Sequence, residues 1–166
     1  ETSYSGWFTG TGRSAWTRIS GPTGSPMTGP TAGYGGRGYY YYTETSNTVS
    51  LGQRFTLGYD GRSCTGGRIV AGVSFRYHMY GATIGSLHLN TASGARVWSR
   101  SNNQGDEWKD SGYVAVNSPS FTFEGVSGAS FTGDIAIDSV IVRCGSNVTG
   151  RGWMICFNND MPLPPP

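Results

Sequence analysis

Apolar and polar residues alternate with a period of two along several stretches of this 166-residue chain. The longest spans 68–80, where the residues of one parity are Ile69, Ala71, Val73, Phe75, Tyr77 and Met79. Because successive side chains of a strand point to opposite faces of a sheet, this pattern predicts a strand with that set toward the core. Shorter stretches predict further strands at 39–45, 54–59, 86–90, 96–98, 111–117, 120–124 and 134–143.

The stretches between these segments are rich in glycine and proline. From Gly21 to Pro30 one of the two recurs every two or three residues, which excludes a helix and predicts a loop. Asp106 and Glu107 are expected in a turn. Apolar positions with helical spacing do not persist for three turns anywhere in the sequence. About eight or more short strands with glycine-rich turns predict an all-β fold, either a sandwich or a jelly roll.

Composition favours one folded domain. The 27 Gly and 8 Pro make 35 of 166 residues, about 21%, but 5 Trp, 10 Tyr and 7 Phe supply rings for a core. A net charge of +2 is too small for a dedicated binder of nucleic acid or of anionic membranes. No run approaches the ~20 apolar residues of a membrane-spanning helix, so direct membrane insertion is not expected. The chain opens at Glu1 without a signal peptide, as expected of a mature or excised piece.

Residues that could carry catalysis are few and show no catalytic motif. The two histidines, His78 and His88, fall within predicted strands, and no Gly-x-Ser-x-Gly nucleophile motif occurs. The ten acidic residues include no recognisable pair for glycoside hydrolysis. Cysteine and histidine also lack the Cys-x-x-Cys or His-x-x-x-His spacing of a metal site. The sequence therefore predicts a protein that is not an enzyme.

Two aspartates four residues apart point to a cation site beside the last long strand. Asp134 and Asp138 share a parity, whereas Ile135 and Ile137 point the other way, toward the expected core. An aspartate in an apolar strand needs a partner, because an unpaired buried charge is very costly. A hard cation such as calcium would serve, and so would hydrogen bonds from backbone amides or from Ser and Thr hydroxyls. The residues leave both alternatives open.

Several runs resemble the signature of one family, the MAM domain (meprin/A5/receptor phosphatase mu). The most distinctive is Phe75-Arg76-Tyr77-His78-Met79-Tyr80-Gly81. The other similar runs are 84–87, 97–99, 104–108, 123–125 and 133–138, with Trp16, 28–30, 38–40 and 43–46 upstream. The similarity covers residues 1–145. It implies a jelly-roll β-sandwich of two antiparallel sheets, which acts outside the cell in adhesion and protein–protein assembly and performs no catalysis.

The resemblance also implies a metal site and a disulfide. Glu1 resembles the acid that opens the family pattern and Asp138 its late aspartate, so these two, with Asp134, are the predicted ligands of one structural calcium ion. The family's further aspartate after the Thr-Gly-Pro motif is missing here. Cys64 and Cys144 resemble the later disulfide pair of the family. Cys156 lies beyond the similarity, and an odd cysteine in a secreted protein suggests an intermolecular bond, a partner outside this segment or a buried thiol.

The function that these observations favour is an extracellular, non-catalytic adhesion module. It would belong to a larger glycoprotein, secreted, on the cell surface or in the extracellular matrix, and would bind protein partners or itself. The predicted interface residues are Tyr39, Tyr40, Tyr41, Tyr42, Trp98 and Cys156. Two alternatives stay open: a carbohydrate-binding module that binds glycans with exposed aromatics, and an accessory domain of a secreted enzyme.

Residues 146–166 are expected to lie outside the domain proper. Asn147 begins an N-glycosylation sequon, which agrees with secretion. Residues 146–160 are predicted to form an extension packed on or near the domain. The proline-rich run 161–166 is predicted to begin a linker.

Overall fold

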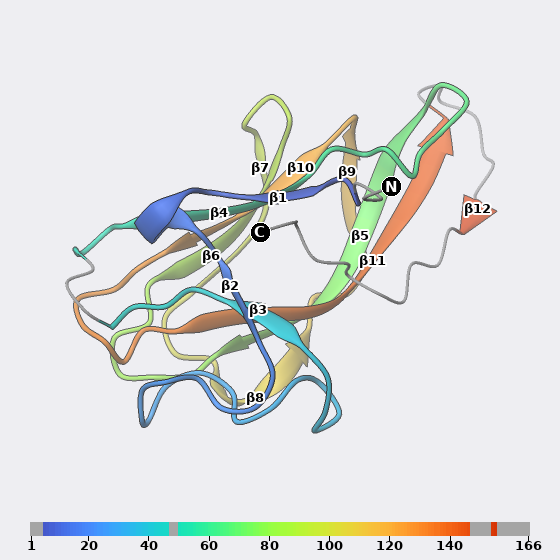
Figure 1. Cartoon of the computed structure of the whole chain (residues 1–166). Coiled ribbons are helices and arrows are strands. Elements are labelled where there is room, and N and C mark those ends of the chain that lie inside the picture. The colour runs from blue at the N-terminus through green and yellow to red at the C-terminus, as the bar shows by residue number, and fades with distance from the viewer. Residues whose placement is uncertain (1–4, 47–49, 147–153, 156–166) are drawn as a thin grey trace.

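A computed structural model describes residues 5–46 and 50–146 and the backbone of Met154–Ile155 (Figure 1). In this part of the chain the strands form two antiparallel sheets that pack face to face, which confirms the predicted all-β sandwich. The five-stranded sheet has the order β1 (Trp7–Thr9), β4 (Arg54–Tyr59), β10 (Phe121–Val126), β6 (Ser86–Thr91) and β7 (Arg96–Ser101).

The seven-stranded sheet is built around two long strands. Its main order is β2 (Thr17–Ile19), β3 (Tyr40–Tyr42), β11 (Ile135–Ser146), β5 (Arg68–Met79) and β8 (Gly105–Asp110). Two further strands complete it: β9 (Val114–Ser118) pairs with β5, and β12 (Met154–Ile155) pairs with β11. A 3-10 turn at Gly12–Ser14 lies between β1 and β2. No helix in the described residues is long and apolar enough to cross a bilayer.

The core lies between the two sheets, where alternate side chains of both meet. Phe75 of β5 contacts Phe123 of β10 edge to face, with 4.8 Å between the ring centroids. The largest wholly enclosed side chains of this layer are Phe55, Leu57, Tyr59, Phe75, Met79, Leu87, Leu89, Phe121, Phe123, Ile135 and Ile137. Enclosing one such side chain stabilises a fold by roughly 1.5–3 kcal/mol, so this layer holds the sandwich together.

The predicted facing of β5 is correct for its second half and wrong for its first. Val73 and the apolar residues after it point into the core, but Val70 does so instead of Ile69 and Ala71. In the β5–β11 pairing, Gly72 and Val70 of β5 lie opposite the consecutive residues Arg143 and Cys144 of β11, so β5 has one extra residue, Ala71, at this point. The pairing of β5 with β9 is also irregular between Val70 and Gly72. A bulge adds one residue to a strand and therefore reverses the facing of the residues beyond it.

The short edge strands were not predictable from alternation. The expected turn at Asp106 and Glu107 is wrong, because both residues lie in β8, which pairs with β5. β8 carries charged residues on both faces, and β1 and β2 have three residues each. Such strands form because a neighbouring strand offers hydrogen-bonding groups, and their own sequences show no clear period.

The disulfide between Cys64 and Cys144 is confirmed. The Cα atoms of the two residues are 5.3 Å apart, and the bond joins positions separated by 80 residues. Cys144 is fully buried in β11, and Cys64 lies in the turn before β5 and packs against the core. The bond therefore ties the start of β5 to the end of its neighbour β11.

Candidate functional site

The long connection between β2 and β3, residues 20–39, covers part of the outer face of the seven-stranded sheet. Beneath it lies a second apolar cluster, separate from the main core, made of Tyr40, Tyr42 and Ala136 with Ile19 and Trp108 at its edge. Tyr40 and Trp108 meet edge to face at 5.7 Å between centroids. An apolar outer face needs a cover to exclude water, and the connection supplies one.

Three of the four consecutive tyrosines are therefore buried. Tyr40, Tyr41 and Tyr42 are only 0%, 2% and 5% exposed, whereas Tyr39 is 55% exposed. Tyr41 points into the main core, and its neighbours point into the outer cluster beneath the connection. The prediction that Tyr40, Tyr41 and Tyr42 contribute to an interface is wrong, because both faces of β3 are covered. Tyr39 alone of the four presents much of its ring to solvent.

Polar contacts fasten the connection to the sheet. The indole Nε1 of Trp108 donates to the carbonyl of Ala32 at 3.0 Å, and the Tyr40 hydroxyl donates to the carbonyl of Gly21 at 2.6 Å. Burial, and secondarily the charge of Asp134, raises the pKa of Tyr40 to about 12, so this hydroxyl keeps its proton at neutral pH. The connection is thus held at two separate points, by the buried ring of Tyr40 and the half-buried ring of Trp108.

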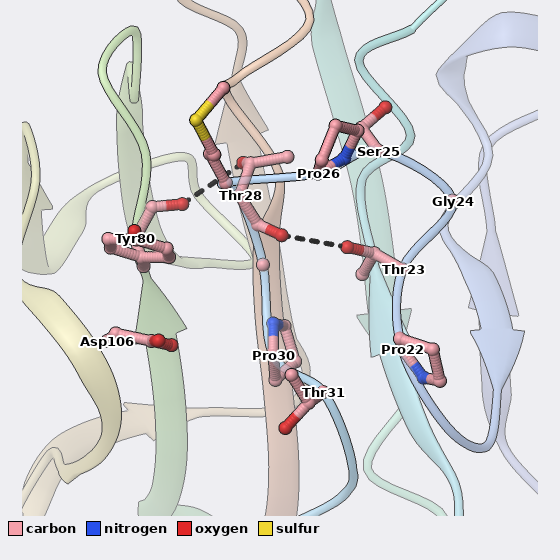
Figure 2. A pocket seen from close by; sticks show the side chains of 12 residues that line it. Pro22, Thr23, Gly24, Ser25, Pro26, Thr28, Pro30, Thr31, Tyr80 and Asp106 are labelled. Carbon is pink, nitrogen blue, oxygen red and sulfur yellow. Dashed lines mark hydrogen bonds between the residues drawn. The ribbon is translucent and has the colours of Figure 1, made fainter.

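A pocket of about 480 Å³ opens between this connection and the ends of β5 and β8 (Figure 2). Tyr80 and Asp106 line one side of it, and Pro22 and Thr23 line the other. Thr28 stands between the two sides: its hydroxyl donates to the carbonyl of Tyr80 at 3.0 Å, and its carbonyl accepts the hydroxyl of Thr23 at 2.9 Å. These bonds hold the two walls together.

Asp106 is positioned at this pocket by a buried histidine. Its Oδ1 lies 3.2 Å from Nε2 of His78, whose side chain is 2% exposed, while 58% of the Asp106 side chain is exposed. Burial lowers the pKa of His78, although the neighbouring Asp106 opposes that shift. A neutral imidazole that donates from Nε2 satisfies this contact. His78 thereby orients the carboxylate without cancelling its charge.

Asp134 is the most deeply buried carboxylate in the described residues. It is 0% exposed, and its Oδ1 accepts hydrogen bonds from the backbone amide and the hydroxyl of Thr45 at 3.1 and 2.8 Å. Burial raises the pKa of Asp134 to about 6 in spite of these bonds. Its own amide donates to the Thr28 hydroxyl, so Asp134 joins β11 to the connection and to the segment after β3.

Asp138 forms a second link between β11 and the connection. Its Oδ2 accepts the backbone amide of Tyr34 at 2.7 Å, and its Oδ1 accepts the amide of Ser139. Desolvation raises the pKa of Asp138, although these bonds work in the other direction. Of the two alternatives for this residue, hydrogen bonds from backbone amides are present.

The exposed tyrosines in the described residues are each paired with an arginine. The guanidinium carbon of Arg18 lies 3.7 Å from the ring centroid of Tyr39, and that of Arg76 lies 4.4 Å from Tyr34. The guanidinium carbon of Arg143 lies 5.4 Å from the ring centroid of Tyr113. The three rings are 55%, 43% and 43% exposed, in that order. Cations attracted to ring faces in this way keep the rings oriented at the surface.

Comparison with known proteins identifies the family. The sequence pattern described as "MAM domain, meprin/A5/mu" matches residues 1–146. This chain belongs to the MAM domain family. "MAM domain-containing glycosylphosphatidylinositol anchor protein 1" is 39% identical in Rattus norvegicus and 40% identical in Homo sapiens, in both cases over 146 residues. Each match covers 78% of the present chain and 15% of the relative.

A more distant relative comes from an amphibian. "Thyroid hormone-induced protein B" of Xenopus laevis is 32% identical over 168 residues, which cover 89% of this chain and 23% of that protein. The chain thus spans about one seventh to one quarter of the length of these relatives. The first two relatives are MAM domain-containing proteins by name, and each of the three has much further chain outside the match.

Trp98 of this MAM domain completes the rim of the core. Its ring packs edge to face on Phe75 and Tyr77, with centroids 5.0 and 5.1 Å away, and it is partly buried. The guanidinium of Arg100 lies 5.0 Å from its ring. Asn147 and Cys156, the other predicted modification and interface positions, lie outside the described residues.

The calcium ion of the MAM domain stays a prediction. Glu1 lies outside the described residues, and within them no three His, Cys, Asp or Glu side chains gather as a metal site. Both oxygens of Asp138 accept backbone amides, so the aspartates alone do not make up a ligand set. A site would need Glu1 or backbone carbonyls in addition.

We expect EDTA to lower the melting temperature of the calcium-loaded domain, because an ion that binds the folded state alone stabilises it by mass action. At a free calcium concentration 100 times the Kd, this stabilisation is about 2.7 kcal/mol. Differential scanning fluorimetry with EDTA, and then with calcium restored, measures the effect. An unchanged melting temperature at low free metal would rule out a stabilising calcium site.

The sequence pattern did not predict the His78–Asp106 pair. One signal was available: Arg76 and His78 share the second face of β5, and Tyr80 follows in the same alternation directly after the strand. Its partners could be found only once Asp106 was known to lie in a strand beside β5. The placement of Asp106 and Glu107 in a turn concealed the pair.

Proposed function

We propose that this MAM domain is an extracellular, non-catalytic module that binds other proteins, or a second copy of itself, within a larger secreted or cell-surface glycoprotein. Membership of the family supports a role in protein interaction. The names of two relatives state that they are glycosylphosphatidylinositol anchor proteins, which agrees with a place at the cell surface. A disulfide that closes a long loop agrees with an oxidising compartment.

The observation that carries the proposal is the set of arginine–tyrosine pairs at the surface. Tyrosine and arginine are enriched at protein interfaces and dominate binding energy there, because each offers a large contact area with polar atoms at its tip. Tyr34 and Tyr39 both belong to the connection 20–39, and Arg18 and Arg76 hold their rings in place. Rings that are ordered before binding lose less entropy when a partner covers them.

The same pairs make a glycan platform less favourable than a protein interface. A sugar stacks on an open ring face, but an arginine lies on one face of each of these three tyrosines. The remaining exposed aromatics come from separate elements: Phe8 lies in β1 and Phe131 in the turn before β11.

Treatment of target cells separates the two kinds of partner. Beads coated with the chain are incubated with intact cultured cells, with cells shaved by a protease, and with cells stripped of glycans by glycosidases. A protein partner predicts that protease abolishes binding and that glycosidases leave it intact. Binding that survives protease and is lost with glycans would support the carbohydrate alternative instead. Aggregation of the coated beads alone would indicate that the domain binds a second copy.

Replacement of the exposed tyrosines tests the proposed surface directly. Tyr34→Ala and Tyr39→Ala should each weaken cell binding about tenfold, which corresponds to about 1.4 kcal/mol, since interface tyrosines are often worth that much. Both rings are exposed, so the melting temperature should change little. Phe131→Ala is the matched control, because it removes an equally exposed ring outside the connection. Equal binding of all three variants and the unmodified chain would contradict this surface.

A further inference from the structure

We infer that the pocket beside Asp106 receives the guanidinium of an arginine side chain carried by a protein partner. The inference rests on the proposed function and names the chemistry of one contact. Nothing in the family match or in the names of the relatives assigns a role to this pocket. Its charge, its walls and its fixed shape carry the argument.

The pocket contains one carboxylate, that of Asp106, which forms no ion pair with a lysine or arginine of the described residues. Among the described residues, Asp106 contacts His78 and no lysine or arginine. The other acids of β8 are already paired: Glu107 with Lys109 and Asp110 with Arg76. Because burial keeps His78 neutral, the Asp106 carboxylate is left uncompensated at the mouth of the pocket. A guanidinium is the cation that pairs with a carboxylate through two parallel hydrogen bonds.

The walls of the pocket offer contacts for both the methylene chain and the planar guanidinium of an arginine. Pro22, Pro26 and Pro30 line the pocket on the side of the connection, and the ring of Tyr80 lines the side of β5 (Figure 2). Apolar ring surfaces of this kind cover the methylene stem of a long cationic side chain. Three guanidinium–tyrosine pairs already occur on the surface of this protein, so a ring such as Tyr80 provides the same contact to an incoming arginine.

The pocket is held open by bonds within its own wall. The amide of Gly29 donates to the carbonyl of Tyr80 at 3.0 Å, and the amide of Thr23 donates to the carbonyl of Pro30 at 3.2 Å. Gly29 has φ of +64°, and a Cβ there would lie 2.6 Å from the hydroxyl oxygen of Thr23, so the turn requires glycine. A wall bonded in this way needs no rearrangement to admit a side chain, which favours binding.

The probe for the test is the capped amino acid N-acetyl-arginine amide, followed by ¹H–¹⁵N NMR of the labelled chain. We expect saturable shifts confined to the amides of the 22–31 turn, Tyr80 and Asp106, with a Kd on the order of millimolar. The citrulline counterpart, which is neutral but of the same shape, should bind at least tenfold more weakly. Addition of salt should weaken the arginine probe and leave the citrulline probe unchanged.

Two variants and a control complete the experiment. Asp106→Asn and Tyr80→Leu should each reduce affinity for the arginine probe at least tenfold. Glu107→Gln, which removes the same charge from the next residue of β8, should leave it unchanged. The melting temperature of each variant shows whether its fold is intact. Equal shifts with citrulline, equal affinity of Asp106→Asn, or the absence of saturable shifts in the unmodified chain would overturn the inference.

Failure of this inference is distinguishable from failure of the proposed function. If Asp106→Asn binds cells as well as the unmodified chain does and the probe gives no shifts, the protein-binding function stands and the pocket has no part in it. If the probe binds in the pocket but protease-treated cells bind the beads normally, the protein-binding function fails and the chemistry of the pocket stands.

Discussion

Replacing Cys64 and Cys144 together with alanine should lower the free energy of unfolding by about 4–5 kcal/mol. The bond closes a loop across 80 residues of sequence, and an unfolded chain with so long a loop loses much conformational freedom. Domains of this size are stable by about 5–15 kcal/mol, so the variant would lie near the limit of stable folding. Urea unfolding followed by tryptophan fluorescence measures the change.

The control for this prediction is the unmodified chain, unfolded with and without a reducing agent. Reduction should reproduce most of the loss, because it opens the same loop without changing the packing of any other side chain. The double variant should then be insensitive to the reducing agent. A loss of less than about 1 kcal/mol in both experiments would contradict the prediction, because the covalent link would then contribute little to the free energy of unfolding.

Lowering the pH from 7 toward 4 should stabilise the domain through Asp134. Its pKa in the folded state is about 6, above the ordinary value of 3.8, because the carboxyl is buried. The folded state therefore binds the proton more tightly than the unfolded chain does, and the protonated form is the stabilising one. This contribution is complete below pH 3.8 and is lost as the pH rises through 6. It amounts to about 3 kcal/mol, since each pKa unit corresponds to about 1.4 kcal/mol.

Asp134→Asn isolates this effect, because asparagine cannot titrate and keeps an oxygen for the two hydrogen bonds from Thr45. The difference in unfolding free energy between variant and unmodified chain, measured at several pH values, removes the contribution of groups such as Glu44, whose pKa is lowered. That difference should favour the variant increasingly as the pH rises from 4 to 7. Parallel pH profiles would contradict a buried, titrating Asp134. Asp110→Asn, at an exposed carboxylate, is the control.

Local patterns were sufficient for the central strands of the sandwich. Alternation predicted the positions of β4, β5, β6, β10 and β11. One face of each strand is enclosed in the core, and a strand buried on one face has apolar residues at every second position. The facing of Ile69 and Ala71 was not predictable in the same way. A bulge depends on how two strands distant in sequence pair, and within β5 its only local sign is Gly72.

The residues of the candidate sites also differ in whether the sequence was sufficient to predict their contacts. The pairing of Cys64 with Cys144 followed from resemblance to the MAM family, because a family pattern already contains the long-range contact. The burial of Tyr40 and Tyr42 did not follow, since a strand's period shows which side chains share a face and is silent on what covers that face. Here the cover comes from twenty residues of glycine-rich connection without a period of their own.

The chain's own pattern was thus enough to establish an all-β sandwich, its central strands and the residue types available for contact. The pocket beside Asp106 required the assembled molecule. His78 and Asp106 lie 28 positions apart and meet because β8 pairs with β5. The proline wall reaches them because hydrogen bonds from Tyr40 and Trp108 fasten a separate connection over the same sheet. The sequence determines which side chains are available, because each residue type is given directly. The tertiary structure decides whether they form a site, because only long-range contacts bring β5, β8 and the connection 20–39 together.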